Sequence, residues 1–335
     1  MVGRRNGFGV WDSHSGASSR YAAAMGLWLH NAGTARNSTR GAHSAAGAGQ
    51  RDAAHPPRVE ILVHPRADRR SVWSGRLVSR GPSGDAGIVA KGKVFAQPQV
   101  YACSLCHYPN GKGRPENANI TGLTYEYFIQ QMMDFRSGAR KTSDPRKANT
   151  GLMTRFAQMM TDDEIKVAAQ YFAAIPATPW ITVVEGATVP KTKPQNGMFL
   201  TLEGEAAGVE PIGERIIETP EKAHDSEFLR NPRSGFIAYV PLGSLKKGEA
   251  LVVNGITADG SKVTACTVCH GGDLRGLGPV PTLAGRSPSY LVRQLYDMQR
   301  GNRNGAWTPL MASAVAHLGP EDLLTAAAYL ASLKP

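Results

Sequence analysis

Apolar side chains recur at helical spacing in two separate stretches of the chain, at 165–172 and at 323–330. The first pattern follows Thr161, and Glu164 stands three residues later, which is the sequence of a helix-starting capping box. The second pattern follows Pro320, and a proline is well suited to the first position of a helix. Each stretch therefore predicts an amphipathic helix with a defined start.

Two earlier helices are expected in each stretch. The first covers about 87–102 in one stretch and 245–254 in the other. The second covers 124–138 and has its counterpart at 287–301. Both of these segments begin with a hydroxyl side chain that can cap a helix and end at a glycine that can terminate it. The pattern thus predicts a similar order of helices in both stretches.

The two stretches are copies of one repeat. Seven positions between 120 and 140 match similar residues 163 positions later, and after a short gap the offset becomes 158. Tyr171 and Tyr329 are then equivalent positions of the last predicted helix. The repeat units span 84–176 and 243–335, and each is long enough to fold as one domain.

Each copy contains one five-residue motif, CSLCH at 103–107 and CTVCH at 266–270. A C-x-x-C-H sequence is typical of c-type haem attachment, in which the two thiols bind the haem and the histidine ligates the iron. A zinc site or a redox dithiol is the alternative, but the histidine after the second cysteine in both copies favours haem. We expect two covalently bound haem c groups, held by Cys103, Cys106 and His107 in the first copy and by Cys266, Cys269 and His270 in the second.

The second axial ligand of each iron is chosen by elimination. Outside the first eighty residues and the two motifs, His224 and His317 are the remaining histidines, and neither has a histidine counterpart in the other copy. Met153 and Met311 are the methionines that keep the same place in both copies, on a predicted loop before the last helix. We expect each to ligate an iron. A His/Met pair would fill both axial positions and leave no vacant site for a substrate.

The first part of the chain, 1–83, is a low-complexity, arginine-rich extension that we expect to be largely disordered. Most of the formal net charge of +11 falls in it, so the charge of the repeats gives no support to nucleic-acid binding. Covalent haem attachment occurs outside the bacterial cytoplasm, which predicts a periplasmic protein. The apolar segment 21–29 is a weak candidate for the core of a leader, and a misassigned start or an unusual leader is the alternative.

The segment between the repeats, 177–242, is rich in proline and contains short β-like stretches such as 181–184. It is too apolar for a flexible tether, so we expect it to pack across one or both repeats. A plain linker and a surface for a partner protein are the alternatives.

The repeats resemble tandem class I cytochromes c, especially the two-domain dihaem cytochrome c4 type. The resemblance rests on the CSLCH and CTVCH motifs, the methionine that follows each and the last helix of each copy, and it covers over half of the chain. It implies an all-α fold of two tandem class I cytochrome c domains, 84–176 and 243–335. A Pro-rich, partly extended connector at 177–242 would join them.

The family pattern also implies two contacts within each domain. A proline carbonyl after the motif accepts the N–H of the ligating histidine, and Pro281 matches that position, whereas Ala118 replaces it in the first copy. A glycine of the first helix packs against an aromatic residue of the last. Gly92 with Tyr171 and Gly248 with Tyr329 have the sequence positions of such pairs.

The resemblance implies electron transfer, one electron at a time, between redox proteins whose identity the sequence does not give. It implies no catalytic residues, and association with a membrane surface or a larger complex is left open. The alternatives are a cytochrome subunit of a larger dehydrogenase and a dihaem cytochrome c peroxidase, which needs one open axial position. Some polar positions suit either hydrogen bonds to haem propionates or surface roles, namely Gln131, Gln294, Arg140, Arg303 and Trp307.

Overall fold

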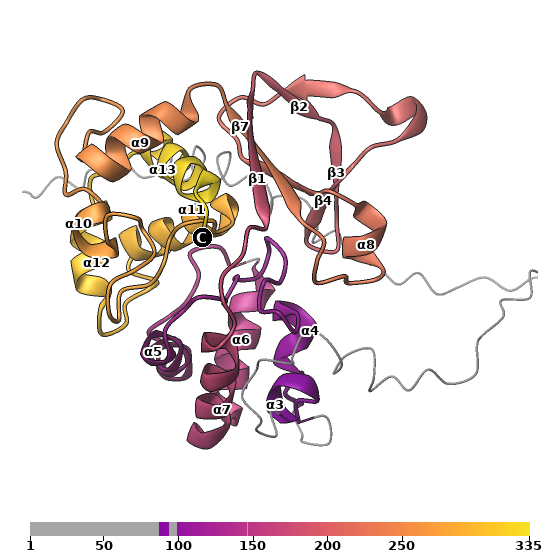
Figure 1. Cartoon of the computed structure of the whole chain (residues 1–335), viewed down its shortest axis with the longest axis vertical. Coiled ribbons are helices and arrows are strands. Elements are labelled where there is room, and N and C mark those ends of the chain that lie inside the picture. Colours follow the sequence, from indigo (N-terminus) through magenta and orange to yellow (C-terminus); the bar gives the residue numbers. More distant parts are fainter. Residues whose placement is uncertain (1–86, 94–98, 146) are drawn as a thin grey trace, which may run out of the picture. The chain divides into compact units, whose positions relative to one another are not determined.

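The computed structural model describes residues 87–93, 99–145 and 147–335, so the predicted extension at 1–83 and its candidate leader lie outside the described residues. Both repeats fold as helices, as predicted, and the connector between them folds into short strands (Figure 1). The chain is therefore helical in its two repeats and β-rich in the segment that joins them.

The described part of the first domain contains five helices. The capping box of its last helix is present, because the Thr161 hydroxyl accepts the Glu164 N–H and the Glu164 carboxylate accepts the Thr161 N–H. The helix before the methionine-bearing segment also starts and ends as predicted, at the Thr124 cap and at Gly138 in the left-handed conformation. The helices are α3 (Gly87–Ala90), α4 (Cys103–His107), α5 (Tyr125–Ser137), α6 (Ala148–Met159) and α7 (Asp162–Ala173).

The first helix is shorter than the predicted 87–102. Gly92 has a φ of +64°, and Lys93 pairs with Val100 as an isolated antiparallel bridge. A Cβ atom at Gly92 would lie 2.3 Å from the Val100 carbonyl oxygen, so this glycine permits a tight turn. The three atoms nearest to a Cβ at Gly92 belong to Val100, Tyr101 and Ala102, so the predicted packing of Gly92 against Tyr171 stays a prediction.

The second domain follows the prediction more closely. Ser287 caps the helix that begins at Pro288, and Gly248 packs directly on the last helix. A Cβ at Gly248 would lie 2.6 Å from the Cβ of Tyr329, which confirms this predicted pair. The helices are α9 (Ser244–Asn254), α10 (Thr267–His270), α11 (Pro288–Gln299), α12 (Thr308–Val315) and α13 (Pro320–Ser332).

Replacing Gly248 with alanine is expected to lower the free energy of unfolding by about 2–3 kcal/mol, because the added methyl group would lie 2.1 Å from the backbone oxygen of Thr325. Gly151 is a matched control, since it also lies in a helix and a Cβ there meets nothing within 4 Å. Gly151→Ala should be neutral or stabilising by about 0.5–1 kcal/mol. Denaturant unfolding of both variants measures the difference, and equal stabilities would contradict the close helix contact.

The connector contains seven strands, one short α-helix and one 3₁₀-helix, η1 (Gly204–Ala206). Strand β7 lies at the centre of a three-stranded sheet, parallel to β1 and antiparallel to β6, while β2 pairs with β5 and β3 with β4. The predicted extended stretch at 181–184 is part of β1. The elements are β1 (Ile181–Gly186), β2 (Thr188–Pro190), β3 (Thr192–Gln195), β4 (Met198–Thr201), β5 (Val209–Pro211), β6 (Ile217–Pro220), α8 (Ala223–Glu227) and β7 (Phe236–Pro241).

The connector has small apolar cores of its own and also joins the core of the second domain. Ile216 and Val240 are buried in the same cluster as the helices of that domain. The fully buried Glu218 carboxylate accepts hydrogen bonds from the Ser287 hydroxyl at 2.8 Å and the Ser289 N–H at 2.7 Å. These bonds at the start of α11 offset part of the cost of burying the carboxylate. The connector therefore packs within the molecule, as expected.

Candidate haem-binding sites

A cavity lies at each C-x-x-C-H motif, and its lining is largely apolar. Aromatic residues of α5, α6 and α7 form much of the first wall, whereas leucine and valine side chains dominate the second. Every predicted site residue lines the cavity of its own domain. The first cavity is lined by Cys103, Cys106, His107 and Met153, and the second by Cys266, Cys269, His270 and Met311.

Both motif histidines have the orientation of an iron ligand. Nδ1 of His107 lies 2.8 Å from the Ala118 carbonyl oxygen, and Nδ1 of His270 lies 2.8 Å from the Pro281 carbonyl oxygen. The alanine in the first copy thus keeps the contact, because the acceptor is a backbone group. Among the described residues, the buried Nε2 of His270 has no hydrogen-bond partner. A ring held at Nδ1 with Nε2 directed into a cavity fits a metal ligand.

The charge state of these histidines agrees with that role. Burial lowers the pKa of His107 and of His270, and the bonds to the Ala118 and Pro281 carbonyls oppose this effect only in part. The rings are therefore neutral near pH 7, with Nδ1 as the donor. A neutral imidazole keeps the Nε2 lone pair that a metal needs.

The two methionines lie on helices, so the predicted loops are wrong. Met153 belongs to α6, and Met311 belongs to α12. Asn149, Thr150 and Gly151 have low helix propensity, and Pro309 disfavours a helix interior. Pro309 instead lies in the first turn of its helix, where its missing N–H costs nothing.

The arrangement of the cysteines disfavours a shared metal centre. Each C-x-x-C pair lines a separate cavity, and in the part of the chain that the structure describes no three His, Cys, Asp or Glu side chains gather as a metal site. The zinc alternative would need thiolates brought together, which this geometry does not provide.

Each domain contributes side chains to the cavity of the other. Tyr290 and Gln294 of α11 line the first cavity, and Tyr127 and Gln131 of α5 line the second. These residues are equivalent in the repeat, so the two domains meet through matching faces. We call this contact the seam.

Two arginines cross the seam in the same way. Arg140 donates to Gln131 at 2.9 Å and to Gln294 at 2.8 Å. Arg303 donates to the same two side chains, at 2.9 and 3.1 Å. Arg140 also reaches the Tyr290 hydroxyl at 3.2 Å, and Arg303 reaches the Tyr127 hydroxyl at 2.5 Å. The backbones of the two arginines pair as an isolated antiparallel bridge.

The environment of Arg140 and Arg303 fits an anionic group in each cavity. Their exposed fractions are 8% and 6%, and neither forms an ion pair with a carboxylate of residues 87–93, 99–145 or 147–335. Buried cations are normally paired with opposite charge. Because Arg140 and Arg303 are buried, the alternative of a surface role is wrong for both. Trp307 also lines the second cavity but is 42% exposed.

Some lining residues were not predicted. Tyr127 and Tyr290 match in the repeat, and that match was the signal for a shared role. Glu116 and Lys147 line the first cavity without an equivalent charge in the second domain. No sequence pattern singles them out.

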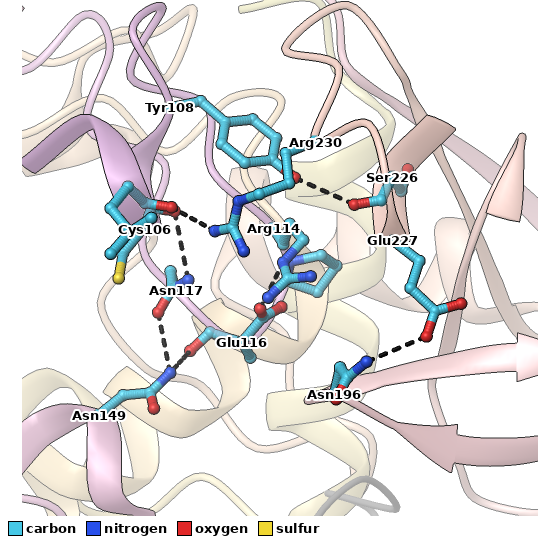
Figure 2. A network of polar contacts seen from close by, with 12 residues as sticks. Cys106, Tyr108, Arg114, Glu116, Asn117, Asn149, Asn196, Ser226, Glu227 and Arg230 are labelled. Atoms are coloured by element: carbon cyan, nitrogen blue, oxygen red, sulfur yellow. Dashed lines mark hydrogen bonds and ion pairs between the residues drawn. The ribbon is translucent and has the colours of Figure 1, made fainter. Parts of the chain in front are cut away.

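Another unpredicted network surrounds the first motif (Figure 2). Asn117 donates to the Cys106 carbonyl at 3.3 Å, and Asn149 donates to the Asn117 side chain at 2.8 Å. Arg230 of the connector donates to the Leu105 carbonyl within the motif. The backbone of this motif is thus held both by its own domain and by the connector.

Comparison with known proteins finds several relatives that are named as cytochromes c. No protein-family profile matches the chain. The chain is 38% identical over 72 residues to cytochrome c-554(548) of Halomonas halodenitrificans, and this match covers 21% of the chain and 87% of that relative. It is 36% identical over 89 residues to cytochrome c4 of Pseudomonas aeruginosa, covering 26% of this chain and 42% of the relative. The match to cytochrome c-552 of Acidithiobacillus ferridurans covers 36% of that relative.

A longer match includes the connector. The chain is 23% identical over 241 residues to a protein of Stutzerimonas stutzeri named thiosulfate dehydrogenase electron acceptor, covering 71% of this chain and 82% of the relative.

Two cavities, each with an attachment motif and an oriented histidine, define a c-type cytochrome with two covalently bound haem c groups. The relatives narrow the class further, and the chain belongs to the dihaem cytochromes c of the cytochrome c4 type.

Proposed function

We propose that the protein is a periplasmic electron carrier that passes electrons one at a time between redox partners through two His/Met-ligated haems. The observation that supports this most is the repeated ligand set. Each cavity combines a histidine fixed by a backbone carbonyl with a methionine at the equivalent position of the repeat. Such a pair gives a closed iron site suited to outer-sphere electron transfer.

The bound haem supplies the one-electron chemistry, and the chain sets its surroundings. Cys103, Cys106, Cys266 and Cys269 would hold the two groups covalently. His107 and His270 would ligate through Nε2, while their Nδ1–H bonds fix the ring planes. Met153 and Met311 would complete the axial pairs, and the apolar walls limit the access of water.

The seam arginines would neutralise the haem propionates. Arg140 and Arg303 are buried and line the cavities, and neither forms a direct ion pair with a carboxylate of the described residues, although Asp134 lies close enough to interact with Arg303 and Asp297 with Arg140. Their bonds to both glutamines place the positive charge between the domains. Each arginine would thus offset the negative charge of the anionic groups that a haem supplies when it is bound in its cavity.

This function predicts uptake of two electrons per chain and no appreciable turnover of peroxide. The same axial pair in both domains leaves no open site, so the peroxidase alternative is disfavoured. An anaerobic redox titration followed by a peroxide assay of the half-reduced protein tests both points. Turnover on the order of 1–10³ s⁻¹, as in ordinary enzymes, would overturn the carrier function.

A second candidate is the electron acceptor of a dehydrogenase, supported by the relatives that carry the name thiosulfate dehydrogenase electron acceptor. These matches extend over 71% of this chain and thus include the connector. Isolation of the protein from its own cells would distinguish the two. A catalytic chain that co-purifies in equal amount supports the second candidate, and a chain that elutes alone supports a diffusing carrier.

The periplasmic location is supported by the covalent attachment of haem, which takes place outside the bacterial cytoplasm. No helix of the described part of the chain is long and apolar enough to cross a membrane. The proposed partners are redox proteins, with no role for nucleic acid, and association with a membrane surface or a complex is the remaining alternative. Cell fractionation with detection of the haem chain tests the location.

A further inference from the structure

The carbonyls that hold the two motif histidines lie on equivalent loops. Residues 118–121 of the first domain correspond to residues 281–284 of the second, at the constant offset of 163. The first residue of each loop accepts the Nδ1–H of the motif histidine in its own domain. We call these two segments the acceptor loops. A group that fixes an acceptor loop therefore also fixes the ring of its histidine.

Each acceptor loop is joined to the haem-motif loop of its own domain in the same way. The Ile120 N–H donates to the Gly111 carbonyl at 2.8 Å, and the equivalent Leu283 N–H donates to the Leu274 carbonyl at 2.9 Å. These bonds are repeated from one domain to the other. They hold each loop within its domain and do not join the two loops.

One arginine bonds to both acceptor loops. Arg286 follows the second loop, and its Nε donates to the Thr282 carbonyl at 3.1 Å. Its Nη1 donates to the Asn119 carbonyl, and its Nη2 donates to the Thr121 carbonyl at 2.8 Å. Asn119 and Thr282 each come directly after the residue that accepts a histidine N–H. The guanidinium is thus bonded next to the acceptor of both rings.

The charge of Arg286 is buried where the two loops meet. Arg286 is 4% exposed, and a Cβ at Gly122 of the first domain would lie 3.7 Å from Cγ2 of Thr282 in the second. No carboxylate in the part of the chain that the structure describes forms an ion pair with Arg286. The three backbone carbonyls therefore stabilise the buried charge. Hydrogen bonds from a charged donor are stronger than those between neutral groups, so both loops are held firmly.

The repeat provides no second arginine of this kind. The position equivalent to Arg286 in the first domain is Leu123, an apolar residue that lines both cavities. Arg140 and Arg303, in contrast, form a matched pair across the seam. A single side chain of the second domain therefore serves the acceptor loops of both domains.

We infer that Arg286 is a positioning residue shared by the two motif histidines. This inference rests on the proposed electron-carrier function, in which these histidines ligate the two irons. The planar guanidinium keeps the carbonyls of both acceptor loops in place for the Nδ1–H groups. Its positive charge favours the reduced state of both haems, because an oxidised iron carries one more positive charge. Electrons come from and return to the redox partners, and Arg286 keeps its proton throughout.

Hydrogen exchange of the two histidine Nδ1–H protons tests this inference, followed by NMR on the fully reduced, full-length holoprotein. Arg286→Gln removes the planar fork and should speed the exchange of both protons about tenfold or more, relative to the core amides of α7 and α13. A general loss of stability would speed the exchange of all these protons together. Equal acceleration of the core amides, or acceleration at one histidine alone, overturns the inference.

Arg293→Gln is the matched control. Arg293 is also buried and donates across the seam, to the Pro115 carbonyl at 2.6 Å, but this carbonyl lies outside the acceptor loops. The variant should change the exchange of the His270 Nδ1–H, relative to the same core amides, by less than about twofold. An acceleration as large as that caused by Arg286→Gln would show that the loss of any arginine bond across the seam loosens the ring, and the inference would be wrong.

An anaerobic redox titration tests the effect of the charge. At a fixed ambient potential, Arg286→Gln should lower the ratio of reduced to oxidised haem about threefold or more for both haems. Arg286→Lys keeps the charge without the planar fork, so the ratio should stay within about twofold of the wild type while the Nδ1–H exchange remains fast. A decrease confined to the second haem, whose cavity Arg286 lines, contradicts a shared role. Full Nδ1–H protection in the lysine variant contradicts positioning by the fork.

The same titration separates failure of this inference from failure of the proposed function. If the wild type takes up two electrons and Arg286→Gln protects both Nδ1–H protons as well as the wild type does, the positioning role is wrong and the carrier function stands. If the wild type takes up no electrons, the carrier function itself is wrong. Should Arg286→Gln fail to accumulate with two haems, Arg286→Lys carries the exchange test.

Discussion

Replacing Met153 with alanine is expected to remove about half of the near-infrared absorption that the ferric protein shows from methionine-to-iron ligation. Met153 lines the first cavity from α6, and Met311 lines the second from α12, so each would serve one haem. Met311→Ala should therefore remove the other half, and the double variant should remove all of it. Each single variant should also lower one of the two reduction potentials, since methionine ligation raises the potential.

Met159→Ala is the control for this experiment, because Met159 lies on the same helix as Met153 and does not line the cavity. It should keep the full absorption. Loss of the whole band in one single variant would mean that only one haem has a methionine ligand. Absence of the band from the wild type would contradict both assignments.

Replacing Arg303 with alanine is expected to lower the free energy of unfolding by about 1–3 kcal/mol. The guanidinium bonds to Tyr127, Gln131 and Gln294, and its removal leaves the buried Tyr127 hydroxyl without this donor, while both glutamines keep only their bonds from Arg140. The equivalent Arg140→Ala should have a similar effect. Because both arginines join the two domains, their loss should also split one thermal transition into two.

Calorimetry of the holoprotein measures this effect. Arg300→Ala is the control, since Arg300 is exposed near the same end of α11, and it should change the stability by no more than about 0.5 kcal/mol. A single transition in the Arg303 variant, with stability within about 0.5 kcal/mol of the wild type, would show that the seam does not couple the domains.

The helices were predictable where their ends are encoded locally. The capping box of Thr161 and Glu164 and the Ser287 cap before Pro288 specify their helix starts through contacts between near neighbours in the chain. The haem residues were predictable for a related reason, because attachment requires two thiols and a histidine at fixed short spacing. Their positions on the cavity walls follow once each repeat folds.

The connector fold depended on contacts that no local pattern contains. Strand β1 pairs with β7, so Ile181 lies opposite Phe236, and between them in sequence β2 pairs with β5 around the hairpin of β3 and β4. The bond from Arg230 to the Leu105 carbonyl joins positions 125 residues apart. Alternation and proline content indicated extended structure, but they did not indicate which domain the connector would cover.

The repeat made some residues of the seam between the two domains predictable. Matches of Gln131 with Gln294 and of Arg140 with Arg303 indicated a shared role. A repeat offset cannot show that each arginine would cross to the other domain, because that depends on how the two domains pack. Conversely, the loop expected around Met153 was wrong because a Gly-containing segment can still form a helix when tertiary packing favours it.

The most direct test of the account is the intact mass of the denatured protein isolated from its own cells, followed by mass mapping of the haem-bearing peptides. The account predicts a chain that carries two covalent haems, one on the peptide with Cys103 and Cys106 and one on the peptide with Cys266 and Cys269. A single haem, two haem-free motifs, or zinc or a disulfide in place of haem at either motif would contradict the two-haem carrier.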